Sequence, residues 1–120
     1  MEKNRMEQLE ALETLSQFND RLLKNLPTIA AELTEGRQPD TDTYMKSITD
    51  AINWEITVMN ATSDLLAEGN ITIDKEGFNQ SILALSTALS SKVDSEIAVA
   101  FRNLIPHFEV LGTAAKEAIA

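Results

Sequence analysis

The chain has 120 residues, of which 43% are hydrophobic, and it contains no cysteine. A single domain of this length buries a core without covalent cross-links, and the lack of cysteine excludes disulfides, cysteine-ligated zinc and thiol nucleophiles. The formal net charge of −9 repels nucleic-acid phosphates and anionic lipid surfaces, so neither nucleic acid nor membrane is an expected partner. We therefore expect one domain over residues 1–120.

The N-terminal residues run directly into a charged amphipathic pattern. No apolar stretch has the length of a signal-peptide core or of a bilayer span. These features predict a cytoplasmic protein.

The first predicted helix covers about residues 2–35, where large apolar residues recur three or four positions apart. Gly36 ends this pattern, and Pro39 belongs to the turn that follows, because proline cannot continue a helix. Pro27 lies inside the helical pattern. Since proline removes an amide donor and clashes with the preceding turn, we expect a kink or a break near Pro27.

The second predicted helix begins at residues 40–42, where an aspartate side chain can cap the first turn, and ends at Gly69. A third helix begins after Asp74. Asp74 has the N-cap position, and Ile73 and Phe78 flank it at the spacing of a hydrophobic staple.

The last predicted helix begins at residues 93–95, and its apolar residues alternate steps of four and three positions, which is typical of a bundle seam. Pro106 predicts a second kink. Only residues 71–73 show a short strand-like alternation. Four helical patterns joined by short connections predict an all-α fold, a four-helix up-down-up-down bundle.

Glu55 is the most unusual residue, because it falls on the apolar face of the second predicted helix. An unpartnered buried carboxylate costs several kcal/mol, roughly, so this side chain must be hydrogen-bonded, protonated, or directed at a cavity or another protein. Antiparallel packing of the first two helices makes Asn19 and Leu22 plausible facing residues. In one interpretation Asn19 and Glu55 satisfy each other and set the helix register; in others Glu55 faces a groove or is a catalytic carboxylate with a raised pKa.

The apolar face of the second predicted helix is wider than the roughly 100° stripe that one side of a core requires. Trp54 lies at its edge, close in angle to Val58. Either Trp54 is buried against a neighbouring helix, or it belongs to a surface for self-association or a partner. The candidate partner or ligand surface consists of Tyr44, Trp54, Glu55, Val58 and Asn19.

Motifs for catalysis, metals and cofactors are missing from the sequence. His107 is the only histidine, so paired Glu-x-x-His motifs and His-Glu-x-x-His cannot occur. No Gly-x-Ser-x-Gly or phosphate-binding glycine loop is present. Residues 72–77 resemble the start of a calcium loop, but Leu83 stands where the bidentate glutamate is required. We expect no enzyme, no metal and no cofactor.

Several short segments carry a family resemblance: Asp50-Ala51-Ile52-Asn53-Trp54, residues 60–66, Val93-Asp94 and Leu104-Ile105-Pro106. Over about residues 48–111 the chain resembles a family of small uncharacterised helical proteins from Gram-positive bacteria. Some relatives are associated with flagellar or export functions, which implies an adaptor or chaperone. The resemblance supplies no catalytic residues.

Taken together, the residues predict a non-enzymatic cytoplasmic module that binds a protein partner or self-associates, for example as a dimer. The alternative is a bundle that binds a small molecule, or a weak acid–base enzyme that uses Glu55.

Overall fold

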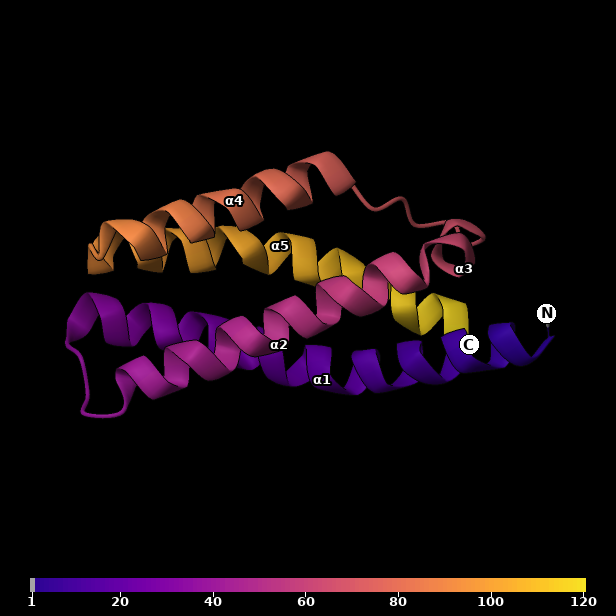
Figure 1. The fold of residues 1–120 in the computed structure, drawn as a ribbon, viewed down its shortest axis with the longest axis horizontal. Coiled ribbons are helices and arrows are strands. Elements are labelled where there is room, and N and C mark those ends of the chain that lie inside the picture. Colours follow the sequence, from indigo (N-terminus) through magenta and orange to yellow (C-terminus); the bar gives the residue numbers. More distant parts are fainter. Residues whose placement is uncertain (1) are drawn as a thin grey trace.

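The computed structural model describes residues 2–120, which form five helices and no strand. Figure 1 shows these helices along the length of the molecule. The all-α prediction is confirmed, and residues 71–73 are irregular chain rather than strand. The helices are α1 (Glu2–Glu35), α2 (Thr41–Ala61), α3 (Ser63–Ala67), α4 (Lys75–Ser91) and α5 (Asp94–Ile119).

The central pair of helices is α1 and α5, which pack on each other; α2 packs on α1, and α4 packs on α5. The four long helices alternate in direction along the long axis of the molecule (Figure 1). Close packing between α2 and α4, which would complete a four-helix ring, is not formed. The predicted four-helix up-down-up-down bundle is therefore not confirmed in detail, because the described residues form five helices. The segment after α2 contains the additional helix α3 and leads α4 onto α5 instead of alongside α2.

The second predicted helix is interrupted at Thr62, which separates α2 from α3. The backbone there leaves helical geometry (φ −112°, ψ 17°), and the Thr62 hydroxyl donates a hydrogen bond of 2.7 Å to the carbonyl oxygen of Val58. Hydroxyl bonds of this kind also occur inside continuous helices, for example at Thr28 and Thr57, so the bond accompanies the break and does not by itself cause it. After the break, Leu65 and Leu66 of α3 are buried in the core.

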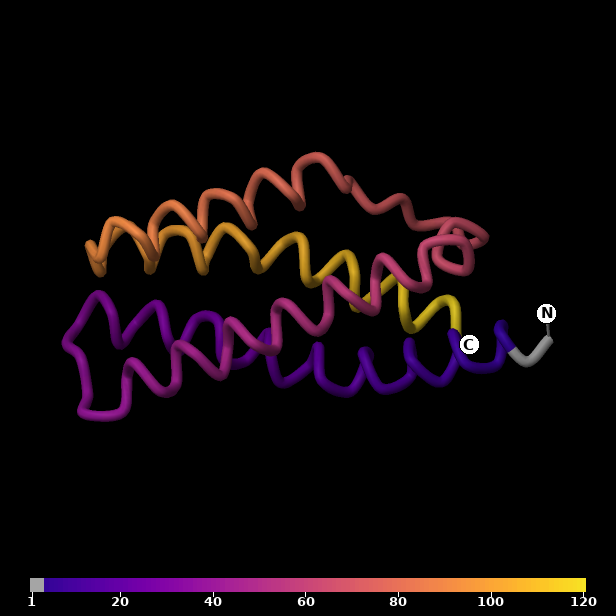
Figure 2. Tube along the Cα trace, viewed as in Figure 1, coloured from indigo at the N-terminus to yellow at the C-terminus, as the bar shows by residue number. Residues whose placement is uncertain are grey.

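The two proline residues do not break their helices: α1 continues through Pro27 and α5 through Pro106. Figure 2 shows α5 running beside α4 at first and then descending toward α1. Gly36 follows α1 with a φ of +152°, a conformation that glycine adopts far more readily than other residues.

The two predicted aspartate caps differ in the structure. Asp74 caps α4, since its carboxylate accepts a 3.0 Å hydrogen bond from the backbone N–H of Gly77. Asp40 has the N-cap position of α2 but makes no capping bond with its side chain. Instead, the backbone N–H of Gln38 donates to the Thr41 hydroxyl at 2.7 Å, which closes the turn before α2.

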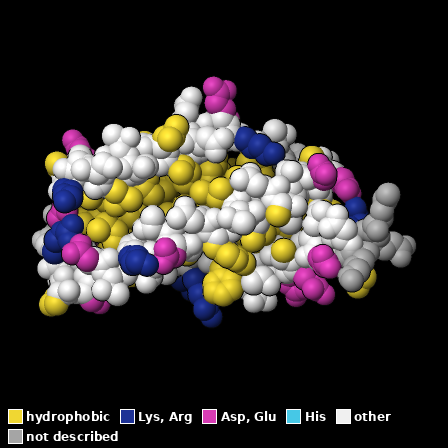
Figure 3. All heavy atoms as spheres, viewed as in Figure 1, with side chains coloured by type: hydrophobic (Ala, Val, Ile, Leu, Met, Phe, Trp, Pro, Cys, Tyr) yellow, Lys and Arg dark blue, Asp and Glu magenta, His cyan; other side chains and the backbone are white. Residues whose placement is uncertain are grey.

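The core is formed by the facing sides of α1 and α5 with one side each of α2 and α4, and it includes the buried aromatic residues Phe78, Phe101 and Phe108. Phe78 and Phe108 pack edge to face, with ring centroids 4.9 Å apart. Figure 3 shows hydrophobic side chains at the surface in the opening between α2 and α4, with charged side chains around the outside. Within residues 2–120, no helix is apolar over enough of its length to cross a membrane.

Candidate functional site

A buried polar cluster joins three helices at mid-length. Glu55 on α2 is fully buried, and its Oε1 accepts a 3.0 Å hydrogen bond from Nδ2 of Asn19 on α1. The same nitrogen donates, also at 3.0 Å, to the carbonyl oxygen of Phe108 on α5. The structure therefore brings Asn19 and Glu55 into direct contact, and their hydrogen bonds connect α1 to both α2 and α5.

Gly112 provides the space for this cluster. It lies one turn beyond Phe108 on α5, and a Cβ atom at position 112 would lie 2.2 Å from Oδ1 of Asn19. A Cβ atom does not approach another heavy atom that closely, so any larger residue at position 112 would displace the Asn19 side chain from its hydrogen bonds. We did not single out Gly112 in the sequence. The sequence feature that could have indicated its role is a glycine inside a helix. Such a glycine costs up to about 1 kcal/mol of stability relative to alanine, so its presence suggests that close packing requires it.

The second carboxylate oxygen of Glu55, Oε2, is buried and has no hydrogen-bond partner among the described residues. Burial raises the pKa of Glu55 from 4.5 to about 7, and the hydrogen bond from Asn19 opposes this rise. Because the side chain has no exposed surface, a substrate reaches this carboxyl only if the helices separate.

An aromatic pair lies on the surface directly outside the polar cluster. Phe18 and Trp54 are the sequence neighbours of Asn19 and Glu55, so each helix directs one residue inward and the adjacent one outward. Their rings meet edge to face at 5.4 Å, and they are 46% and 39% exposed. The guanidinium of Arg21 lies 5.6 Å from the centre of the Phe18 ring, within cation–π range.

A groove with a volume of about 180 Å³ extends along the surface between α1 and α2. The hydroxyl of Tyr44 donates a 2.7 Å hydrogen bond to Oδ1 of Asn25 within it. We call this groove together with Trp54 the α1/α2 surface. The residues that line the groove are Phe18, Arg21, Leu22, Asn25, Tyr44, Ser47, Ile48 and Ala51.

The five candidate residues from the sequence divide into two groups in the structure. Tyr44 is half-buried at the groove and Trp54 is exposed beside Phe18. Asn19, Glu55 and Val58 are buried, so none of these three is available to a partner in this conformation. Phe18, which completes the aromatic pair, is one of the large apolar residues whose spacing predicted the first helix and its core-facing side. The exposure of Phe18 depends on where α2 crosses α1. The spacing of apolar residues within one helix does not predict that crossing point.

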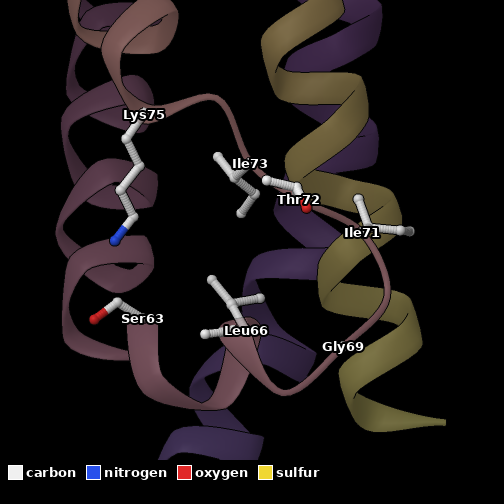
Figure 4. Close-up of a pocket in the computed structure, with 8 residues that line it drawn as sticks. Ser63, Leu66, Gly69, Ile71, Thr72, Ile73 and Lys75 are labelled. Carbon is white, nitrogen blue, oxygen red and sulfur yellow. The ribbon is translucent and has the colours of Figure 1, made fainter.

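A second hollow, with a volume of about 220 Å³, lies where the chain leaves α3 and enters α4. Figure 4 shows the Lys75 side chain extending along this hollow with its amine toward the hydroxyl of Ser63, opposite Leu66 and Ile73. Acidic residues adjoin both polar groups in the sequence, namely Asp64, Asp74 and Glu76. These three acidic residues do not line the hollow itself, where Lys75 is the only charged lining residue.

His107 belongs to the core boundary of α5, where its ring lies 5.5 Å from the Phe78 ring. Among the described residues, no three histidine, aspartate or glutamate side chains are grouped as metal ligands.

The fold and the site define a small all-α protein with a buried carboxylate–amide cluster beneath an exposed aromatic pair. Residues 10–113 match a protein family described as a domain of unknown function (DUF8042), and the chain belongs to that family. No curated protein and no solved structure matches the chain.

Proposed function

We propose that this protein is a non-enzymatic interaction module that binds a partner protein through the α1/α2 surface. The exposed, edge-to-face pair of Phe18 and Trp54 is the observation that supports this proposal most directly. The proposed setting is the cytoplasm, and the proposed role is that of an adaptor or chaperone, which the resemblance to flagellar or export-associated proteins of Gram-positive bacteria also implies.

The residue types of the α1/α2 surface are those that dominate binding energy at protein interfaces. Tryptophan, tyrosine and arginine are enriched among interface hot spots, and Trp54, Tyr44 and Arg21 lie together here. The Phe18 ring contacts both Trp54 and Arg21, and these contacts restrict its side chain before a partner docks. A surface that is already ordered loses less conformational entropy when a partner docks.

A second candidate function uses Glu55 as the centre of a small-molecule site or as a weak acid–base catalyst. A pKa of about 7 and the unpartnered Oε2 support it, since a proton-transfer group works best with a pKa near the working pH. The complete burial of Glu55 favours the interaction module instead, because no ligand reaches the carboxyl in this conformation.

The interaction proposal is tested by site-specific photo-crosslinking in the native cells. A photoreactive phenylalanine analogue at position 54 should yield one dominant covalent adduct with a protein. The same analogue at position 83 is the matched control, because Leu83 is 66% exposed but lies on α4. Adding Phe18→Ala should remove the adduct at position 54. Equal adducts from positions 54 and 83, or none from either, would contradict the proposal.

A further inference from the structure

We infer that the partner of the α1/α2 surface is an acidic amphipathic helix of about three turns. This inference rests on the proposed function and names the chemistry of the segment that docks there. Charge, groove length and the absence of a strand edge each support it.

Arg21 lines the groove on its α1 side, and the exposed Lys24 follows it on the same helix. Arg21 and Lys24 lie one turn apart, and neither has an ion-pair partner among the described side chains. Asp50 lies one turn before Trp54 on the opposite helix and is paired with Lys46. Arg21 is the only charged residue among those that line the groove, and Glu32 lies near its Tyr44 end, so the positive charge is local to the Arg21 side on a protein whose net charge is −9. The complementary partner has carboxylates along one edge. Four other basic residues are held in ion pairs with acidic residues, namely Arg5, Arg37, Lys46 and Lys116, whereas Lys75, Lys92 and Arg102 have no ion-pair partner among the described side chains.

The length of the surface sets the length of the partner. Tyr44 lies on the groove and Trp54 beside Phe18 at its far side, ten residues apart on one helix. At about 1.5 Å of rise per residue this separation is about 15 Å, or roughly three helical turns. A helix of this length presents apolar residues at positions i, i+3 or i+4, and i+7 to such a groove.

A helical partner fits better than an extended one. An extended peptide binds most readily by adding a strand to a sheet edge, and residues 2–120 contain no strand. A helix satisfies its own backbone hydrogen bonds and needs only an apolar groove and complementary charges. The floor of this groove is apolar, since Leu22, Ile48 and Ala51 line it.

A second copy of this chain fits the surface poorly. In a two-fold dimer each copy presents the same patch to the other, which brings the Arg21 and Lys24 pairs of both copies together. The two protomers also repel at long range, because each carries a net charge of −9. A different protein with an acidic helix avoids the first penalty. The long-range repulsion acts on it as well, and at contact it is offset by the local charges of Arg21 and Lys24.

The test uses three synthetic helical peptides with the same leucine and alanine face and with glutamate, glutamine or lysine at the remaining positions. Binding to the intact chain is followed through the fluorescence of Trp54, the only tryptophan. We expect the glutamate peptide to bind about tenfold more tightly than the glutamine peptide, as two surface ion pairs allow, and the difference to shrink in high salt. Arg21→Glu with Lys24→Glu should make the lysine peptide the preferred ligand.

The matched control is Lys92→Glu with Arg102→Glu, which makes the same charge change at exposed positions on the α4/α5 side of the molecule. This variant should keep the preference for the glutamate peptide. An unchanged preference in the Arg21/Lys24 variant, or no binding of any peptide, would overturn the inference.

Sedimentation of the chain alone tests self-association. A dimer that the Arg21/Lys24 reversal dissociates would show that the occupant is a second copy and would also overturn the inference. If position 54 crosslinks to a partner protein but the chain shows no preference for the glutamate peptide, the proposed function is supported and only the inference of an acidic helix is contradicted. If neither the crosslink at position 54 nor the preference for the glutamate peptide is observed, both the proposed function and the inference of an acidic helix are contradicted.

Discussion

The side-chain amide of Asn19 donates a 3.0 Å hydrogen bond to the carboxylate of Glu55, 36 residues away in the chain. One residue before each of them, Phe18 and Trp54 meet on the surface. Two consecutive residues on each helix therefore build both the buried polar cluster and the exposed aromatic pair. Because the two pairs share the same backbone, the hydrogen bond and the ring contact belong to the same crossing of α1 and α2.

The buried carboxyl of Glu55 should make stability depend on pH. Its pKa is 4.5 in the unfolded chain and about 7 in the folded protein, so the folded state binds the proton more tightly between these values. The contribution of Glu55 to the free energy of unfolding is therefore highest below pH 4.5. It falls as the pH rises through 7 and then levels off. The total loss is about 3 kcal/mol. Glu55→Gln should remove this slope, so the variant gains stability relative to the parent at pH 8 but not at pH 4.5.

Urea unfolding of both proteins from pH 4 to pH 9 measures this effect. The difference between parent and variant isolates Glu55, because all other titrating groups are shared. Curves that stay parallel over the whole range would show that Glu55 titrates normally.

Gly112→Ala should destabilise the protein, because the new methyl group overlaps Oδ1 of Asn19. We expect a loss of about 1–3 kcal/mol in the free energy of unfolding, despite the better helix propensity of alanine. With Asn19→Ala already in place, the same glycine substitution should be neutral or stabilise by up to about 1 kcal/mol. Thermal or urea unfolding of the four proteins in this double-mutant cycle gives the coupling energy. Strict additivity of the two substitutions would contradict the proposed packing.

The cap of α4 gives a smaller effect. Asp74→Ala removes the acceptor of the Gly77 backbone N–H and should lower stability by about 1 kcal/mol. Asp74→Asn is the matched control, since asparagine caps helices about as well as aspartate and should restore most of the loss. Urea denaturation at pH 7 separates the two variants, and equal losses would indicate that charge rather than capping is responsible.

The aromatic pair should contribute modestly to folding. Phe18→Ala, Trp54→Ala and the double variant should show a coupling energy of about 0.5–1.5 kcal/mol, the usual range for an edge-to-face pair. Each single variant should keep its helical circular dichroism spectrum, because both side chains are substantially exposed. A collapse of the fold in either single variant would show that the pair belongs to the core and not to a binding surface.

The periodicity of the sequence was sufficient to identify α1, with its bounds at residues 2 and 35, and to place the start of α4 at its Asp74 cap. It also marked Glu55 as a polar residue on an apolar face, and antiparallel packing of the first two predicted helices made Asn19 a plausible facing residue. The first three of these features depend on residues within a few turns of one another, since helix periodicity, glycine stops and caps act through local backbone geometry and hydrogen bonds.

Tertiary structure decided the rest. The end of α2 at Thr62, the open side between α2 and α4, the contact of Phe18 with Trp54 and the requirement for Gly112 all depend on how helices cross. A helical repeat specifies which residues share a face but not which helix that face meets. That choice is made by side-chain packing between residues far apart in the chain, where a glycine on α5 makes room for an asparagine on α1.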